Sequence, residues 1–484
     1  MVNRPPQTKK QPITIAKFGG INTKTSLKSI GDNEFGLLLN LMPIDDGNLS
    51  TIPANNEITP TTPTTARRMT NIILDGCVHT FIFDGQHLYD GSTLVGNFTN
   101  PRLTVWNGVE VLIIDPLGYF TYSSGTLSTP QIFGSVEGNI AIYNNRVWLS
   151  QGKTVIFSAA GSYTDFDPAG GAGVFTLNDS NLRTRITGFC VNDNILYIFG
   201  DHSIYAVSSI QIVGTETVPQ LINTGSVIGT SAQELIINFN NFVIFANDLG
   251  IFTVKGIEVQ KISDNLNGIW KFLSPLTASQ ATINGLPVYL LYSAIITPFN
   301  PLITTTYIIL AFYNGKWFML SSIEGQITYS QSDMPVYQFN GGLNELFTGN
   351  GVMPSTLETK LYGFQYEEFF KKLYSGGLAF KTPDINCAIT LNAVSEEKTS
   401  IDYDFTSPTG QINFVNSTGG LLQFQNSTAG NLDFLVSAQE NVIRKYMEMF
   451  GYYLGFSLKS TNKYTLERMF MEIAPIQTNH NLGD

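Results

Sequence analysis

The sequence is poor in the residues that build metal centres and disulfide frameworks. Its 484 residues include only three cysteines and four histidines. Cys77, Cys190 and Cys387 lie far apart, and there is no Cys-x-x-Cys and no His-Glu-x-x-His. An odd number of cysteines leaves one unpaired in any pairing scheme. We therefore expect buried, reduced thiols, and the sequence predicts neither a metal site nor a cofactor.

Charged residues are also scarce, and those present are mostly acidic. They make up 13% of the chain, with 27 Lys and Arg against 38 Asp and Glu, which gives a formal net charge of -11. This balance argues against a general electrostatic grip on nucleic acid or anionic lipid. The 43% hydrophobic residues, 12% aromatic residues and 44 glycines favour sheets with many tight turns over long helices.

Segments for export or membrane insertion are lacking as well. The N-terminus, MVNRPPQTKKQ, has no apolar stretch of the kind found in secretory signals. The most hydrophobic run, residues 286–312, is interrupted by Pro298, Asn300 and Pro301. Each remaining piece is too short to cross a bilayer. We expect two buried strands joined by a loop, and no membrane anchor.

No complete catalytic or phosphate-binding motif occurs. Gly152-Lys153-Thr154 lacks the earlier glycine of a P-loop, because Val147 stands there, and no helical pattern follows. Asp165 lies two residues before a second aspartate but lacks the further ligands of a calcium loop, so we expect a turn. Gly-x-Ser-x-Gly and a strand-linked Gly-x-Gly-x-x-Gly are also absent. We therefore expect no enzymatic activity.

Four arginines and four tryptophans are candidate ligand-binding residues. A sialidase-like propeller needs arginines that converge on a substrate carboxylate, and glycosidases need a pair of carboxylates. The spacing shows no such convergence for the candidate arginines, which are Arg102, Arg146, Arg183 and Arg185. The four tryptophans lie in or beside expected strands, which favours core packing over sugar stacking; they are Trp106, Trp148, Trp270 and Trp317.

A diverged repeat runs from about residue 67 to 365. Each copy reads as a turn, an alternating apolar strand, another turn and a second strand, as in WNGVEVLIIDPLGYFTYSSG, YNNRVWLSQGKTVIFSAAG and VNDNILYIFGDHSIYAVSS. Dividing this span by roughly 40 to 50 residues per four-stranded repeat gives six or seven blades. The sequence thus predicts an all-β protein with a β-propeller, the alternative being a pair of β-sandwiches.

The flanking regions differ from the repeat. A Thr- and Pro-rich strap occupies residues 51–65, and a near-repeat of about ten residues between 412 and 431 predicts a small sheet. Residues 453–475 predict two closing strands. Residues 437–451 predict a helix with Ser437 and Glu440 as a capping box, although a strand remained the alternative. The expected domains are 1–65, 66–370 and 371–484.

Three blocks of sequence resemble tail hub proteins of short-tailed bacteriophages, also called nozzle or packaged-DNA stabilization proteins. The first is FGGINT at 18–23, followed by Gly31-Asp32 with Glu34, Asn40 before Pro43, and Gly47-Asn48-Leu49 ahead of Pro53. The second combines NRVW at 145–148 with SYTDF at 162–166, and the third is the closing stretch 451–475. The motif residues carrying the resemblance are Phe18, Gly19, Gly20, Asn22, Asn40, Gly47, Asn145, Arg146, Trp148, Asp165 and Phe166.

The resemblance implies a propeller that carries a β-rich platform domain built from N- and C-terminal segments. It implies a homohexameric ring in the virion tail, assembled in the host cytoplasm beneath the head-to-tail adaptor. Such a ring extends the channel for double-stranded DNA without sequence-specific binding, retains the packaged genome, and offers docking sites for tail fibres, spikes or a needle. An acidic channel wall would let a duplex slide by repelling its phosphates.

Two alternatives remain open from the sequence. A glycan-cleaving propeller is suggested by fold analogy alone, which is a weak basis because one fold hosts many functions. A glycan-binding module is suggested by Tyr- and Asn-rich turns such as YNN and VNDN.

Overall fold

The computed structural model describes residues 10–45, 47–58, 63–131, 138–178, 180–214, 216–330, 334–363, 369–384, 387–397, 400–406 and 440–476, together with four two-residue strands between 414 and 432. The chain divides into two compact units. A propeller unit comprises residues 55–313 and 321–349, and a terminal unit comprises residues 1–54, 314–320 and 350–484.

The boundaries between the units differ from the sequence-based ones. The divisions fall after residues 54 and 349, whereas the expected boundaries follow residues 65 and 370. Strand pairing explains both shifts. Strand β5 (Asn56–Ile58) pairs with β32 (Leu343–Glu345) inside the propeller unit. Strand β33 (Ser355–Thr359) pairs with β2 (Phe35–Leu39) inside the terminal unit.

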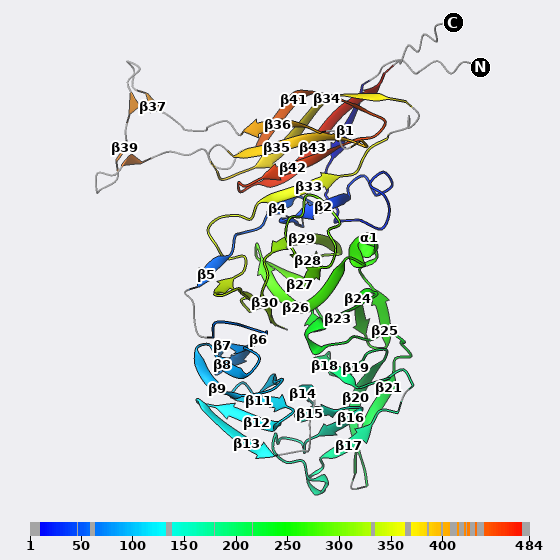
Figure 1. Ribbon diagram of the computed structural model, residues 1–484, viewed down its shortest axis with the longest axis vertical. Coiled ribbons are helices and arrows are strands. Elements are labelled where there is room, and N and C mark those ends of the chain that lie inside the picture. The colour runs from blue at the N-terminus through cyan, green and yellow to red at the C-terminus, as the bar shows by residue number, and fades with distance from the viewer. Residues whose placement is uncertain are drawn as a thin grey trace, which may run out of the picture. The chain divides into compact units, whose positions relative to one another are not determined.

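The propeller unit consists of antiparallel strand groups in chain order (Figure 1). Four groups are separate four-stranded sheets: β10 to β13 (Arg102–Trp106, Glu110–Asp115, Gly118–Ser123, Thr126–Gln131), β14 to β17 (Ile140–Tyr143, Arg146–Gln151, Thr154–Phe157, Gly173–Thr176), β18 to β21 (Ile186–Asn192, Ile195–Gly200, Ile204–Val213, Glu216–Asn223) and β22 to β25 (Ile236–Phe239, Phe242–Asn247, Gly250–Lys255, Glu258–Lys261).

The remaining strands of this unit complete the circle. They are β26 to β28 (Leu273–Ile283, Leu286–Ile295, Tyr307–Tyr313), β6 to β9 (Arg68–Leu74, Cys77–Phe83, His87–Asp90, Thr93–Asn97), and β30, β31 and β32 (Gln326–Tyr329, Tyr337–Phe339, Leu343–Glu345) with β5. The last two groups form one sheet, because β30 pairs in parallel with β6. The N-terminal strand β5 therefore supplies the outer strand of the last group.

The first strands of the groups contact one another in a closed cycle: β6, β10, β14, β18, β22, β26, β30 and again β6. This closed, all-β arrangement confirms the predicted fold class. Closure protects strand edges that an open sheet would expose. Apolar side chains fill the wedges between neighbouring groups. One wedge holds Trp148 and Phe157 against Phe189 and Ile198, and all four side chains are at most 2% exposed.

Tight turns of Asn, Asp and Gly join the first and second strands of most groups. Both central residues have positive φ in the pairs Asp75-Gly76, Asn107-Gly108, Asn144-Asn145, Asp193-Asn194, Asn240-Asn241 and Asn284-Gly285. Two-residue hairpins favour this backbone because its twist matches that of the strands, and Asn, Asp and Gly tolerate it best. The repeated turn signal in the sequence therefore corresponds to the inner hairpins of the propeller.

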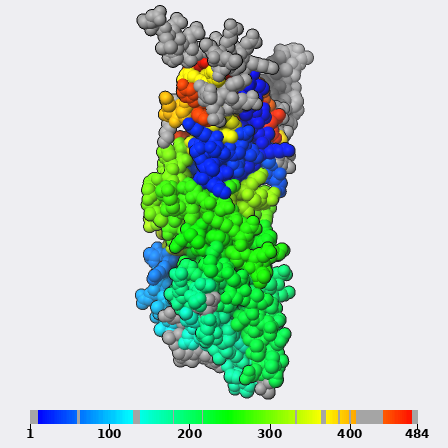
Figure 2. Space-filling view, turned by 90° about the vertical axis from the view of Figure 1, so that its right-hand side faces the viewer, coloured from blue at the N-terminus to red at the C-terminus, as the bar shows by residue number. Residues whose placement is uncertain are grey.

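The terminal unit joins segments from both ends of the chain. One sheet has the order β3-β4-β43-β34-β41 (Leu41–Pro43, Leu49–Thr51, Thr465–Pro475, Lys371–Lys381, Glu440–Gly451), and β1 (Gln11–Ile15) also pairs with β43. The other runs from the first part of β29 (Lys316–Ser322) through β2 and β33 to β42, β35 and β36 (Leu454–Ser460, Ala388–Ser395, Ser400–Thr406). In the space-filling view, blue N-terminal residues lie beside yellow and red C-terminal ones (Figure 2).

Most of the segments predicted as strands form strands, but the one segment predicted as a helix does not. The two closing strands and the two strands of the hydrophobic run are confirmed as β42, β43, β27 and β28. The helix expected at 437–451 is wrong. Residues 440–451 form β41, because their side chains alternate between the buried Met447 and Met449 and exposed neighbours such as Glu448 and Phe450. Ser437, the expected cap, lies outside the described residues.

The near-repeat forms two small hairpins, β37 with β38 (Phe414–Val415, Leu421–Leu422) and β39 with β40 (Phe424–Gln425, Asn431–Leu432); their Asn-Ser-Thr turns lie outside the described residues. All four tryptophans are buried, as expected. Cys190 and Cys387 are buried, but Cys77 is exposed because it begins β7 next to an inner turn. No helix in the described part of the chain is long and apolar enough to cross a membrane.

Candidate functional site

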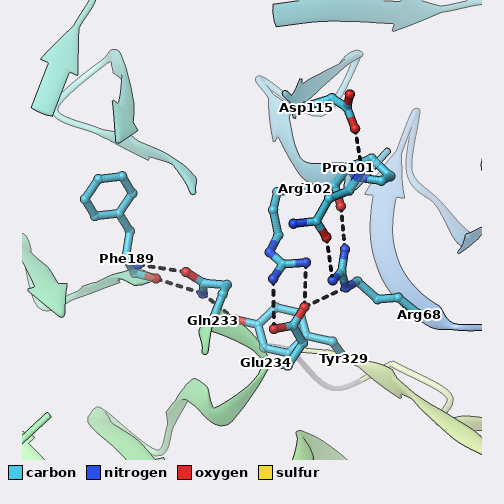
Figure 3. A network of polar contacts seen from close by, with 9 residues as sticks. Arg68, Pro101, Arg102, Asp115, Phe189, Gln233, Glu234 and Tyr329 are labelled. Carbon is cyan, nitrogen blue, oxygen red and sulfur yellow. Dashed lines mark hydrogen bonds and ion pairs between the residues drawn. The ribbon is translucent and has the colours of Figure 1, made fainter. Parts of the chain in front are cut away.

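The centre of the propeller is crossed by an ion-paired strut of three residues, Arg68, Arg102 and Glu234 (Figure 3). Arg68 and Arg102 begin the inner strands β6 and β10, whereas Glu234 lies in the short helix η2 (Gln233–Leu235) just before β22. Glu234 Oε1 is 2.6 Å from Arg68 Nε and 2.7 Å from Arg102 Nη1. Arg102 Nη2 also donates to Glu234 Oε2 at 3.1 Å. The strut therefore links the neighbouring inner strands β6 and β10 to the helix before β22, a strand that is adjacent to neither of them in the cycle.

Gln233, the residue before Glu234, forms hydrogen bonds to two further strands of the propeller unit. Gln233 Nε2 donates to the carbonyl oxygen of Phe189 at 3.0 Å, and its Oε1 accepts from Phe189 N at 2.7 Å. Gln233 Nε2 also donates to the Tyr329 hydroxyl at 2.9 Å, and that hydroxyl donates to Ile236 O at 2.8 Å. Helix η2 thus contacts the inner strands β6, β10, β18 and β30.

Burial and charge act in opposite directions on the strut. The side chains of Arg68, Arg102 and Glu234 are between 13% and 20% exposed. Burial alone would raise the pKa of Glu234, but Arg102 and Arg68 outweigh it and hold that pKa below its usual value. Burial lowers the pKa of Arg68 to about 10, an effect that Glu234 partly offsets. Glu234 and Arg68 are therefore both charged near neutral pH.

Residues of the strut line two cavities in the propeller unit. A central cavity of about 350 Å³ is lined by Arg68, Arg102 and Glu234 and by the aliphatic side chains of the inner strands, including Ile73, Val105 and Ile142. A second hollow of about 310 Å³, here called the mouth cavity, is lined by Arg102, by Pro116 and by residues at or just before the starts of β10, β14, β18 and helix η2. Arg102 therefore contributes to both.

The structure separates the four arginine candidates. Arg102 and Arg185 both line the mouth cavity, so two of them do converge. Arg146 is 7% exposed, and its Nη1 donates to Ser158 O at 2.6 Å and Gly171 O at 2.7 Å, which gives it a structural role. Arg183 is exposed and does not line the cavity. Sequence spacing could not show this convergence, because the two arginines belong to different strand groups.

The second block of resemblance residues belongs to the scaffold of the β14 to β17 group. Asn145 occupies the left-handed second position of the inner turn, with a φ of 54°. Trp148 is fully buried; its Nε1 donates to Tyr143 O at 3.0 Å, and its ring stacks on Phe157 at 4.9 Å. Asp165 Oδ1 accepts from Asp167 N at 2.9 Å, and Phe166 packs edge-on against Tyr119. The aspartate pair therefore stabilises turns.

Gly152, of the Gly-Lys-Thr triplet, also has positive φ and lies in the turn between β15 and β16.

The first block lies in the core of the terminal unit. Phe18 is fully buried and contacts Phe35, and Asn22 Nδ2 donates to Glu34 Oε2 at 2.8 Å. A Cβ on Gly19 would lie 2.8 Å from Asn33 O, and one on Gly20 would lie 2.6 Å from Trp317 N. Only glycine fits such close backbone approach.

The remaining two residues of the first block have backbones in the left-handed region. Asn40 has a φ of 56°, and its Nδ2 donates to Pro354 O at 2.7 Å. Gly47 has a φ of 79°, and a Cβ there would lie 2.9 Å from Lys17 Cα.

Sequence reasoning missed the strut. Glu234 is an acidic residue next to an apolar strand, in QELIINF. This change from a charged to an apolar stretch is the only local signal that could have singled it out. Within the described ranges, no group of three or more His, Cys, Asp or Glu side chains is arranged to hold a metal ion. Burial raises the pKa of the Cys190 thiol to about 12 and that of Cys387 to about 11, which keeps both protonated and unreactive.

No protein-family model and no curated protein matches the chain. Among solved structures, it is similar to an exo-β-1,3-galactanase from Phanerochaete chrysosporium with galactose, at a TM-score of 0.27 and 11% identity over 86% of this chain and 99% of that one. The same enzyme as a variant with β-1,3-galactotriose gives 0.26 and 11% over 87% and 99%. A protein described as a glycoside hydrolase gives 0.24 and 10% over 87% and 100%. Similarities this weak say nothing about the activity of this chain.

Proposed function

We propose that this chain is a structural virion protein, the subunit of a homohexameric tail hub that extends the DNA channel below a head-to-tail adaptor. The observation that carries the proposal is the position of the resemblance residues. Phe18, Gly19, Gly20, Asn40 and Gly47 fix backbone and core where the N-terminal segment joins the C-terminal strands in one unit. Such residues specify an architecture and perform no chemistry.

The centre of the propeller is closed by side chains, so DNA in the proposed ring would have to follow another path. The strut of Arg68, Arg102 and Glu234 crosses the centre, so a duplex does not pass through a single propeller. The channel of the proposed ring would therefore lie between copies. The net charge of -11 disfavours tight binding of phosphates along such a channel.

The centre of the propeller is poorly suited to glycoside hydrolysis. That reaction generally uses two carboxyl groups, one of them protonated as an acid. Glu234 is the one carboxylate among the described residues that line the central cavity, and two arginines keep it ionised. We propose that the protein acts through shape and electrostatics, without turnover, and that fibres, spikes or a needle dock on the ring in the virion tail.

The mass of the full-length protein in solution, alone and with the adaptor ring, tests this proposal. We expect a six-fold ring with a central hole in class averages of the assembled particle. Protein that stays monomeric in both conditions would overturn the ring. Hydrolysis of host surface polysaccharide by the purified chain would overturn the absence of turnover and favour the glycan-cleaving alternative.

A further inference from the structure

The terminal unit exposes two sheet faces that differ in composition. One sheet ends at strand β41 and the other at β36 (Figure 1). A Cβ on Gly376 of β34 would lie 2.4 Å from Met447 Sδ and 2.8 Å from Phe456 Cζ, so the two sheets pack with these side chains between them. The opposite side of each sheet is directed away from this core.

Large apolar side chains are exposed along the edge strand β41. Its residues alternate between the buried Met447 and Met449 and outward-facing side chains. Val442, Tyr446 and Phe450 are between 39% and 65% exposed. Aromatic residues and arginine are enriched at protein–protein interfaces. The outward-facing set is here called the aromatic face and consists of Val442, Arg444, Tyr446, Glu448 and Phe450 with Lys372 of β34 and Phe470 of β43.

The aromatic face carries an unpaired positive charge. The guanidinium of Arg444 lies 4.8 Å from the ring centre of Phe470, and Arg444 makes no ion pair within the described part of the chain. A second arginine, Arg468, lies 5.7 Å from the same ring. Lys372 pairs with Glu448, so these two charges offset one another. In a chain whose net charge is -11, such a face suits an acidic protein surface.

The outward side of β36 is acidic and is here called the acidic face. Asp402 and Asp404 are exposed and alternate with the fully buried Phe405. The Asp402 carboxylate makes no ion pair or hydrogen bond within the described residues, and Asp404 Oδ1 accepts from Thr390 Oγ1 at 2.8 Å. Lys459 is on the same side but two strands away, because it lies opposite Thr390, which lies opposite Asp404.

We propose that, in the ring, the aromatic face of one copy packs against the acidic face of the next copy. Arg444 then lies against Asp402 and Asp404 of the neighbouring copy, and the exposed aromatic side chains are covered. This inference rests on the proposed function and assigns residues to the contact that builds its ring. The contact lies within the terminal unit, which the propeller does not share.

The arrangement of the two faces favours a ring over a dimer. Each copy carries both faces, so the contact is head-to-tail, and a repeated head-to-tail contact forms a ring when its rotation closes. A two-fold contact between two aromatic faces would bring the two Arg444 side chains together, and like charges oppose association. Strand β41 has twelve residues. At about 3.3 Å per residue it spans roughly 40 Å, which is long enough for an interface of standard size.

Charge reversal in the full-length protein tests the contact, with solution mass in the presence of the adaptor ring as the measurement. Arg444→Glu and Asp402→Arg each place like charges against one another. Each should raise the protein concentration needed for half-maximal assembly by at least about tenfold. An equal mixture of the two variants should assemble within about threefold of the parent concentration, because copies that alternate around a six-fold ring restore opposite charges at every contact.

Lys24→Glu is the matched control, because Lys24 is an exposed residue between β1 and β2 and the substitution changes charge as Arg444→Glu does. It should assemble like the parent. A parent that forms no ring would overturn the proposed function and this contact together. If the parent forms rings, single variants that also assemble normally would overturn the contact alone, as would a mixture that fails to assemble. Normal rings of Arg444→Glu that no longer retain DNA would assign the aromatic face to DNA and would also overturn the contact.

Discussion

Glu234 shows how much of the propeller depends on one side chain. It is the acid between two buried arginines, and its neighbour Gln233 bonds to Phe189 and Tyr329. A buried charge is tolerated when its partners compensate for lost hydration, and removing one partner leaves the others uncompensated. The strut is therefore expected to stabilise the propeller only while Glu234 is ionised.

Glu234→Gln should destabilise the propeller unit by roughly 3 kcal/mol near pH 7, because it leaves two arginines without their carboxylate. The pKa of Glu234 is lowered in the fold, so its contribution is fully present above its unfolded pKa and is lost as the pH falls through the lower folded pKa. The stability difference between parent and variant should therefore shrink below about pH 4.5.

Denaturant unfolding followed by tryptophan fluorescence measures this difference, because Trp106, Trp148 and Trp270 belong to the propeller unit. Glu258→Gln is the control, since Glu258 is an exposed residue of β25. It should have little effect at any pH. A difference that stays constant from pH 7 to acid would show that Glu234 acts through shape and not through charge.

At the scale of single elements, the inner hairpin turns connect sequence directly to structure. Asn144 and Asn145 both have positive φ between β14 and β15. The two strands then pair in a register that places Tyr143 opposite Arg146. The register in turn sends Trp148 into the wedge core beside Phe157. A change in the turn is thus expected to reach the packing between strand groups.

Asn145→Val should destabilise the propeller unit by roughly 1 to 2 kcal/mol, because a β-branched residue is strained at positive φ. Asn145→Gly should be nearly neutral, because glycine adopts this backbone freely. The unfolding midpoints of the two variants and the parent provide the comparison. Equal losses in both variants would assign the effect to the Asn145 side chain and not to the turn.

At the scale of the whole molecule, each unit is completed by strands from distant parts of the chain. In the terminal unit, β1 and β4 pair with β43, and β2 pairs with β33. In the propeller unit, β5 pairs with β32 and supplies an outer strand. The described strands β1, β2 and β4 of the N-terminal segment thus complete sheets whose other strands come from later in the chain.

Deletion of residues 1–50 should abolish assembly of the proposed ring while the propeller unit keeps its fold. The deletion removes β1 to β3 and most of β4, but it spares β5 and every other strand of the propeller. Solution mass and near-UV circular dichroism follow the two effects. A protein that lacks only residues 1–9 is the control and should assemble like the parent. Intact rings formed by the larger deletion would refute the prediction.

The sequence by itself determined the all-β class, the inner hairpins and the closing strands. These depend on local signals, namely Asn-Gly type turns and alternation of apolar residues, that act over a few neighbouring positions. It failed at residues 440–451, where helix formers such as Glu440 and Met447 form strand β41, because pairing with β34 along its whole length outweighs local propensity.

Only the tertiary structure decided which distant residues meet. It placed Arg68 and Arg102 on Glu234, brought Arg102 and Arg185 to one cavity, and moved β5 into the propeller. These outcomes follow from closure of the circle of strand groups, which joins residues more than a hundred positions apart. No local pattern carries that information, because side chains that converge at the centre come from different groups with no fixed spacing between them.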